Sequence, residues 1–232
     1  MHRFYNPTIT EGSRHLPEDE SKHCAQILRM QPGDSIQVMD GNGGVFTCEL
    51  TRVSKNRCEY EILQQLAKQG KGFRTHLFIA PTKNADRMEW LIEKLSELGV
   101  DQVTFLITQN SERRKLRLDR LEKKAINAIK QSGNPFLTKL SEATSLKEAL
   151  ASVDSEIKLI AHVDQSHRYI GDLVTSGKDA AICIGPEGDF TSEEIEWAKV
   201  NGFQPVSLGN NTLRTETAGF AACCLINFVN RH

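Results

Sequence analysis

The stretch IGPEGDF, residues 184–190, joins a short apolar run to a segment that has the features of a helix. The run AAIC precedes it, and TSEEIEWAKV follows it. Thr191 and Glu194 have the T-x-x-E spacing of a capping box, which marks the first turn of an α-helix. The stretch therefore predicts a strand, a tight turn and a capped helix in immediate succession.

The residues of this turn have properties that suit a ligand. Gly185 and Gly188 allow backbone amides to approach a bound molecule without a Cβ in the way, and Pro186 stiffens the backbone. Glu187 places a carboxylate at a helix N-terminus, a position that otherwise attracts anions. A ligand with ribose hydroxyls or a positive centre fits this arrangement better than a bare phosphate. A strand-to-helix turn without a ligand would explain the same residues, so the pattern alone leaves both interpretations open.

A second stretch of the same kind, SLGNNTLRTETAGF, spans residues 207–220. A strand, a polar loop and an apolar helix follow one another here, and Thr215 is suited to cap the helix. Arg214 and Glu216 lie between two segments that we expect to be buried. They form either an ion pair that locks the loop or part of a functional site. If the two strands are neighbours, the loops that follow them enclose one pocket.

Both stretches belong to a region in which strands and helices alternate. Apolar strands are expected at 75–81, 100–107, 157–163, 180–185 and 205–209, and helices at 84–99, 118–133, 146–153, 191–200 and 215–229. Strands that are apolar on both faces and alternate with helices predict an α/β fold, with a parallel sheet covered on both sides. Ligands of such sheets lie beyond the carboxyl ends of the strands.

The first 70 residues have a different, mostly β pattern. Residues 35–40 and 45–50 alternate at period 2 around GNGG, which predicts a hairpin. A third strand is expected at 57–63 and a short helix at 17–29. The polar, glycine-containing stretch at 66–73 predicts a boundary. We therefore expect two domains, at 1–72 and 73–232.

Composition excludes several classes of protein. Of the 232 residues, 39% are hydrophobic and 25% charged, as in a protein with an ordinary core. No apolar run approaches the roughly 20 residues of a membrane helix, and the N-terminus lacks the apolar core of a signal peptide. We therefore expect a cytoplasmic protein without a membrane partner. The six cysteines form no CxxC motif, and His162, Asp164 and His167 lack a convincing further ligand, so no metal is expected.

Charge is unevenly distributed along the chain. The net charge is −1, but residues 111–130 carry eight Lys or Arg and three Asp or Glu. Such a segment forms either a solvated helix face or a surface that contacts RNA phosphates.

The two loops together resemble the hallmark segments of the SPOUT methyltransferases, which have a trefoil knot. More narrowly, nearly the whole chain resembles the bacterial 16S rRNA (uracil-N3) methyltransferases of the RsmE family. The other segments that carry this resemblance are HCAQILRMQPGDSIQVMDGNGG (23–44), RMEWLIEKLSELGVDQV (87–103) and AIKQSGNPFLTKL (128–140). It implies a small PUA-like β-barrel that helps to hold RNA, followed by a knotted SPOUT domain that binds S-adenosyl-L-methionine and forms a homodimer. The implied substrate is a uridine of 16S rRNA in the small ribosomal subunit.

The resemblance also implies roles for individual residues. The cofactor-binding positions are Ile184, Gly185, Pro186, Glu187, Gly188, Leu208, Gly209, Leu213 and Thr215. The catalytic positions are Arg214, which would stabilise the uracil anion, and Glu216, which would orient Arg214 or accept the N3 proton. For RNA binding, the resemblance points to Arg29, for which a structural surface role is an equal alternative. Arg113, Arg114 and Lys115 are RNA-binding candidates because they lie in the basic segment at 111–130.

The chain departs from the family pattern at Asn210-Asn211-Thr212, and around Q-S at Lys130 and Asn134. Two alternatives remain: a SPOUT methyltransferase that acts on another RNA position, and a non-catalytic RNA-binding factor of ribosome assembly. The N-terminal β region argues against the first. The presence of both GPEG and Arg214 argues against the second.

Overall fold

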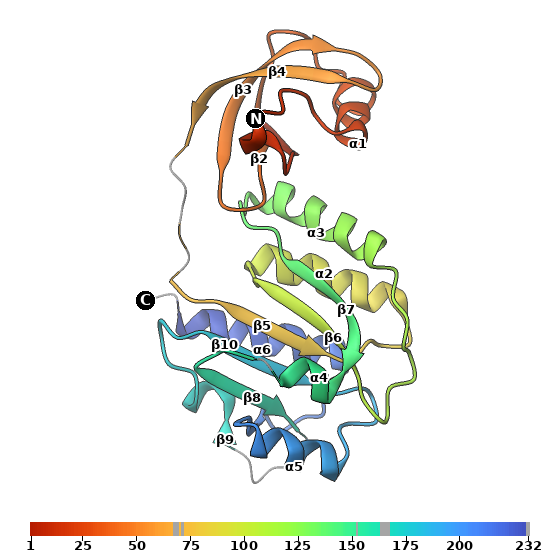
Figure 1. The fold of residues 1–232 in the computed structure, drawn as a ribbon, viewed down its shortest axis with the longest axis vertical. Coiled ribbons are helices and arrows are strands. Elements are labelled where there is room, and N and C mark those ends of the chain that lie inside the picture. Colours follow the sequence, from red (N-terminus) through yellow and green to blue (C-terminus); the bar gives the residue numbers. More distant parts are fainter. Residues whose placement is uncertain (67–69, 71, 152, 163–167, 231–232) are drawn as a thin grey trace. The chain divides into compact units, whose positions relative to one another are not determined.

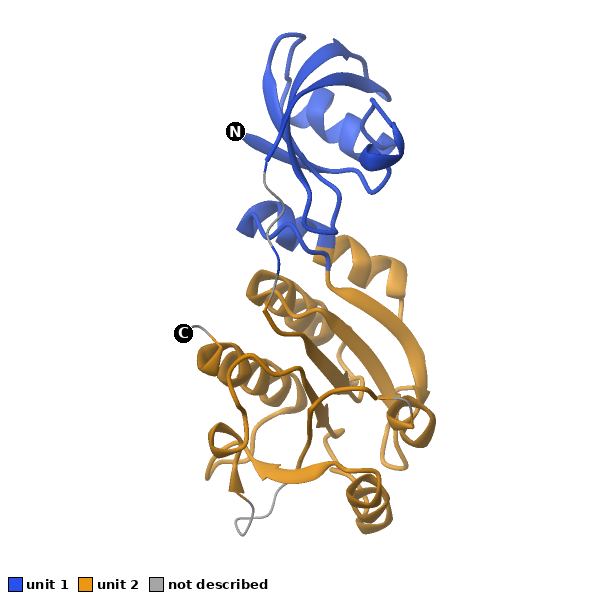
Figure 2. Ribbon diagram, turned by 60° about the vertical axis from the view of Figure 1, so that its left-hand side comes forward, with its two compact units in different colours: residues 1–70, 126–137 blue, residues 71–125, 138–232 orange. Residues whose placement is uncertain are grey.

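The computed structural model describes residues 1–66, 70, 72–151, 153–162 and 168–230. They divide into two compact units (Figure 2), one of residues 1–70 with 126–137 and the other of residues 71–125 with 138–232. No sequence signal associated residues 126–137 with the first unit.

A four-stranded sheet in the order β1-β2-β3-β4 forms the first unit. Its strands are β1 (His2–Tyr5), β2 (Ser35–Met39), β3 (Val45–Val53) and β4 (Cys58–Gln65). β1 runs parallel to β2, and the other pairs are antiparallel. The predicted hairpin is confirmed. Asp40 stabilises its turn, because its Oδ1 accepts hydrogen bonds from the backbone N–H of Asn42 and Gly44 at 2.7 and 2.8 Å.

The predicted helix at 17–29 is present but changes character along its length. It begins as α1 (Glu18–Lys22) and continues as the π-helical turn η2 (His23–Ile27), after the 3-10 turn η1 (Ile9–Glu11). Cys24 in this segment is fully buried and packs into the core that the sheet forms with Phe4, Ile36 and Tyr60. The short strand β1 was not predicted, because four residues with a single buried side chain give no periodic signal.

Residues 126–137 belong to the first unit because several interactions attach them to it. They include the last turns of α3 (Leu118–Ser132). Arg3 Nη1 donates to the carbonyl oxygens of Lys130 and Gln131, both at 3.3 Å, at the C-terminus of this helix. Lys130 Nζ also lies 2.6 Å from the buried Glu20 carboxylate. The β2–β3 turn adds two backbone bonds to the same segment, Gly43 N to Pro135 O and Leu137 N to Gly41 O.

The second unit is an α/β fold around a parallel sheet, as predicted (Figure 1). Its strand order is β7-β6-β5-β10-β8-β11-β9, and all neighbouring strands are parallel. The strands are β5 (Thr75–Ile79), β6 (Gln102–Ile107), β7 (Lys139–Ser145), β8 (Ile157–Ala161), β9 (Arg168–Tyr169), β10 (Ala180–Ile184) and β11 (Gln204–Ser207). The edge strands β7 and β9 were not predicted, because neither contains a buried residue.

Helices cover both faces of this sheet, which confirms the two-sided arrangement. The helices α2 (Ala85–Leu98) and α6 (Thr215–Val229) pack against each other, and α6 contacts β5 and β10. On the other face, α4 (Leu146–Leu150) and α5 (Ser192–Val200) share a core with Phe78 and Cys183. The 3-10 turn η3 (Ile170–Asp172) contacts α6. Among the described residues, no helix has the length and apolar character needed to cross a membrane.

One histidine of the central strands is half-buried in surroundings that favour its neutral form. His76 of β5 stacks on Phe78 with ring centroids 3.8 Å apart. Its Nε2 lies 2.9 Å from Thr104 Oγ1. Burial lowers the pKa of His76 from its ordinary value of 6.5 to about 4.

We expect His76 to weaken the fold as the medium becomes acidic. Between pH 6.5 and pH 4 the unfolded chain binds a proton at this residue that the folded chain does not, so stability falls as the pH falls. The loss should be about 2 kcal/mol in the free energy of unfolding. Urea unfolding at several pH values measures it, with His76→Gln as the control that carries no titrating ring. Equal pH dependence of the two proteins would contradict this assignment.

Candidate functional site

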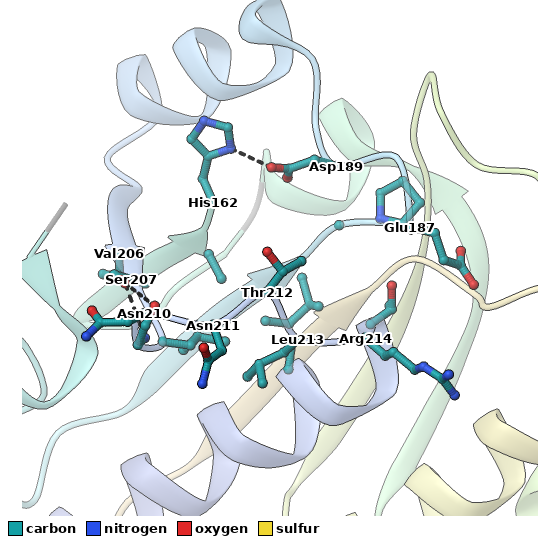
Figure 3. A pocket seen from close by; sticks show the side chains of 18 residues that line it. His162, Glu187, Asp189, Val206, Ser207, Asn210, Asn211, Thr212, Leu213 and Arg214 are labelled. Carbon is teal, nitrogen blue, oxygen red and sulfur yellow. Dashed lines mark hydrogen bonds and ion pairs between the residues drawn. The ribbon is translucent and has the colours of Figure 1, made fainter. Parts of the chain in front are cut away.

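A cavity of about 360 Å³ lies where the central strands of the second unit end (Figure 3). One wall consists of Ile184, the last residue of β10, together with residues 185–187 and 189 after it, and residues 206–215 form another. Ala161 and His162 at the end of β8 and Ala218 on α6 complete it. The strand order explains this, because β8 pairs with both β10 and β11 and all three are parallel. The volume falls in the range of small-molecule sites.

The cavity brings together most residues of the two sequence motifs. The predicted cofactor positions that line it are Ile184, Gly185, Pro186, Glu187, Leu208, Gly209, Leu213 and Thr215. Arg214 also lines it. Gly188 and Glu216 do not line the cavity, although Gly188 lies between the lining residues Glu187 and Asp189, and Glu216 directly follows Thr215. The departures from the family pattern, Asn210, Asn211 and Thr212, all line the cavity.

The GPEG turn is fixed from the helix side by a complete capping box. Glu194 N donates to Thr191 Oγ1 at 3.2 Å, and Thr191 N donates to Glu194 Oε2 at 2.9 Å. Glu194 Oε1 also accepts a hydrogen bond from Gln109 N at 2.9 Å. The carboxylate of Glu194 therefore caps the helix that follows the turn and also connects this helix start to the loop after β6.

A second anchor comes from Asn110, which sequence reasoning did not single out. Its Nδ2 donates to the carbonyl oxygens of Gly188 and Asp189, each at 3.0 Å. A Cβ at Gly188 would lie 3.3 Å from Asn110 Cβ, so glycine permits this close approach. No local sequence pattern identifies Asn110, because its partners lie almost 80 positions away.

The second loop leads into α6 differently from the prediction. Arg214, with an extended backbone, occupies the N-cap position, and Thr215 is the first helical residue and is buried. The expectation that Thr215 caps this helix is therefore wrong. Before the loop, Ser207 Oγ bonds to both the N–H and the carbonyl of Gly209, each at 3.2 Å.

The two residues predicted to be catalytic have opposite environments. Arg214 is exposed at the cavity, and in Figure 3 its guanidinium extends in the same direction as the Glu187 carboxylate. Glu216 is buried, and its Oε1 lies 3.5 Å from Nε of Arg87 on α2. Its Oε2 is buried without a hydrogen-bond partner among the described residues. The ion pair at Glu216 thus joins α6 to α2.

His162 and Asp189 are in contact through their side chains at the cavity. His162 Nδ1 lies 2.8 Å from Asp189 Oδ2, and both residues line the cavity. The sequence indicated His162 only as a possible metal ligand, together with Asp164 and His167, which lie outside the described residues. Within the part of the chain that the structure describes, no group of three or more His, Cys, Asp or Glu is placed to hold a metal.

The predicted RNA-binding residues fall into two groups. Arg113 is half-buried and donates to the carbonyl oxygens of Lys115 and Lys83 at 3.0 and 3.1 Å, so it supports the local backbone. Arg114 and Lys115 are exposed. Arg29, in the first unit, is also exposed and has a φ of 53°, a left-handed conformation that is rare outside glycine.

Much of the positive charge of residues 111–130 is neutralised by acidic neighbours. Arg120 and Lys124 lie 2.5 and 3.5 Å from the buried carboxylate of Glu89 on α2. Lys130 pairs with Glu20, as described above. Three basic side chains of α3 therefore take part in intramolecular ion pairs. Arg114 and Lys115, just before the helix, are exposed and have no ion pair among the described residues.

Family models match both parts of the chain. A model described as an RNA methyltransferase domain matches residues 69–227, and one described as an RNA methyltransferase PUA domain matches residues 16–63. The chain is 26% identical to the ribosomal RNA small subunit methyltransferase E of Rickettsia conorii, over 99% of this chain and 96% of that protein.

Two solved structures are similar over almost their whole length. A probable rRNA-methyltransferase from Porphyromonas gingivalis is 40% identical, with a TM-score of 0.93, and the match covers 99% of this chain and 98% of that one. The ribosomal RNA small subunit methyltransferase E of Neisseria gonorrhoeae, solved bound to S-adenosyl methionine, is 32% identical with a TM-score of 0.88. That match also covers 99% of this chain and 98% of the other.

The Arg87–Glu216 contact predicts a specific loss of stability. Arg87→Met leaves the buried Glu216 carboxylate without its cation, which should lower the free energy of unfolding by about 2 kcal/mol. Urea unfolding measures this loss. The double variant Arg87→Met/Glu216→Gln should recover part of it, because the buried group is then neutral. An Arg87→Met protein as stable as the parent would show that the pair contributes nothing.

Proposed function

Because the chain belongs to the ribosomal RNA small subunit methyltransferase E family, we propose that it methylates N3 of a uridine in 16S rRNA of the small ribosomal subunit, with S-adenosyl-L-methionine as the methyl donor. The observation that carries this proposal is the cavity in which the two motif loops meet at the carboxyl ends of β10 and β11. A family resemblance alone would not require the motif residues to share one site.

The cavity suits S-adenosyl-L-methionine in both size and chemistry. Ile184, Leu208 and Leu213 offer apolar surface to an adenine ring, and Glu187 offers a carboxylate to ribose hydroxyls or to the positive sulfonium. The turn at 185–188 and the loop at 208–213 present backbone groups that have no competing side chain at Gly185 and Gly209. Most small-molecule sites combine an apolar lining with a few placed polar groups in this way.

Transfer to uracil N3 requires that a weakly acidic proton leaves before nitrogen attacks the methyl group. Positioning of acceptor and donor in line supplies much of the rate, and a cation near the uracil oxygens stabilises the developing anion. We assign the cation to Arg214, because it is exposed where it lines the cavity. The burial of Glu216 and its contact with Arg87 favour a positioning role for this carboxylate over that of proton acceptor.

RNA is proposed to contact both units. In the first unit the exposed Arg29 is the candidate, and in the second Arg114 and Lys115 are. Salt-sensitive binding would depend on such exposed cations, since each phosphate contact releases a counterion. Arg113 would act indirectly, by supporting the backbone of this segment through its bond to Lys115.

Two finer features of the fold belong to the same proposal. The first unit would close into a PUA-like barrel, which the bridge between His15 and Glu59 of β4 supports. The second unit would contain a trefoil knot. The path of the chain supports the knot. After β11, which lies near one edge of the sheet, the chain returns to the centre as α6, which packs on β5 and β10.

We also propose that two copies associate through the outer side of α6, in the cytoplasm. From Ala218 to Val229 this helix contains Asn227 as its only polar side chain, and a helix that is apolar all round is normally buried. Phe220 lies edge-on to Trp90 of α2, with ring centroids 5.4 Å apart, and Phe228 is 66% exposed. A second copy that places the same face against this one would cover both aromatic groups.

Transfer of labelled methyl groups tests the activity directly. The acceptors are small ribosomal subunits from cells that lack the modification, with naked rRNA and tRNA in parallel. Label recovered as 3-methyluridine in 16S rRNA would establish the reaction. Label in another nucleotide would favour a methyltransferase of another RNA position. No label in any acceptor, with cofactor binding intact, would favour a non-catalytic factor of ribosome assembly.

Arg214→Ala should separate binding from chemistry. We expect it to lower the transfer rate at least about 100-fold, the scale of losing one charge-stabilising group. Binding of S-adenosyl-L-methionine, measured by calorimetry, should change little. Equal loss of binding and transfer would make Arg214 a structural residue of the loop.

The homodimer predicts that Phe228→Asp yields a monomer. A carboxylate at this exposed aromatic position would be buried without a partner in the interface, which is strongly unfavourable. Sedimentation velocity at matched concentrations compares the variant with the parent chain. Val200→Asp, on the far face of the sheet, is the control and should leave the dimer intact, because Val200 is 86% exposed on α5. A monomeric parent protein would contradict the interface.

A further inference from the structure

The His162–Asp189 contact bridges two chain segments that wall the cavity. His162 directly follows β8, and its backbone N–H donates to Val206 O of the neighbouring β11 at 3.2 Å. Its side chain crosses to Asp189, at the exit of the GPEG turn, where Nδ1 and Oδ2 are 2.8 Å apart (Figure 3). A carboxylate only accepts hydrogen bonds when ionised, so Nδ1 is the donor in this contact.

The backbone of Asp189 is in an unfavourable conformation. Its φ is 59°, in the left-handed region that favours glycine. Two contacts of its carboxylate explain why Asp, instead of Gly, occupies this position. Oδ1 accepts a hydrogen bond from Phe190 N at 2.7 Å while Oδ2 faces His162. One carboxylate thus ties the end of the turn both to its own backbone and to the strand β8.

We propose that His162 and Asp189 are a positioning pair, which holds the GPEG turn in the shape that binds the methyl donor. This inference rests on the proposed function. Asn110 and Glu194 anchor the turn from the side of the β6 loop and α5, whereas the pair anchors it from the side of β8. Without this bridge the turn would become ordered only when the ligand binds. The free energy needed to order it would then lower the affinity for the ligand.

The strain at Asp189 allows the positioning role to be separated from a merely structural one. Asp189→Gly removes the bridge and at the same time relieves the left-handed backbone, so its stability toward urea should equal or exceed that of the parent. Its dissociation constant for S-adenosylhomocysteine, measured by calorimetry, should rise about tenfold, as expected for the loss of one charge-assisted hydrogen bond. The KM for S-adenosyl-L-methionine should rise by the same factor, and kcat should change less.

Three further variants complete the experiment. Asp189→Asn retains one acceptor oxygen, which can serve Nδ1–H or Phe190 N but not both, so it should weaken binding less than Asp189→Gly does. His162→Phe keeps a ring but loses the donor, and it should weaken binding as Asp189→Gly does, with no further loss in the double variant. Glu193→Gln, an exposed acid in the first turn of α5, controls for the loss of one negative charge and should leave binding unchanged.

Other outcomes would overturn the inference in distinguishable ways. Unchanged affinity of Asp189→Gly would show that the pair does not act on the ligand site. A loss of stability that parallels the loss of affinity would make the pair an ordinary structural tie. A parent protein that binds neither S-adenosylhomocysteine nor S-adenosyl-L-methionine would overturn the proposed function itself.

Discussion

The parallel pairing of β10 with β5 on one side and β8 on the other is the constraint on which the rest of the second unit depends. All five residues of β10 are buried, so its position is set by packing on both faces. Because neighbouring strands run in the same direction, their carboxyl ends meet at one edge of the sheet. The loops after β8, β10 and β11 are therefore brought together by backbone pairing, before any contact between their side chains.

Side chains then refine a site that the sheet has already placed. Glu194 serves two loops with one carboxylate, as cap of α5 and as acceptor for Gln109. Arg87 and Glu216 connect the helix that leaves the site to the neighbouring helix on the same face. In both cases charged side chains hold elements of the scaffold together. The cavity itself is lined mainly by backbone, apolar and small polar groups. Affinity in such a site depends on how rigidly the loops are held.

The sequence predicted the features that depend on local patterns. The capping box at Thr191, the helix expected at 84–99 and the hairpin around GNGG are all confirmed, since each follows from residue types within a few positions. The features that it missed depend on distant partners. Asn110 meets the GPEG turn, Arg87 meets Glu216 and His162 meets Asp189 only after folding. The short or exposed strands β1, β7 and β9 were missed for another reason, since they lack a buried periodic face.

Two separate segments of the chain make up the first unit, so its folding depends on the order in which they are synthesised. Residues 1–70 leave the ribosome before residues 126–137 are made. At roughly 5–20 residues per second, several seconds pass before Lys130 can reach Glu20. During that interval Glu20 has no cation at the position that Lys130 later fills, and the β2–β3 turn lacks its backbone partners at Pro135 and Leu137. The N-terminal unit therefore cannot reach its final packing as a nascent domain, and its maturation is coupled to synthesis of more than half of the chain.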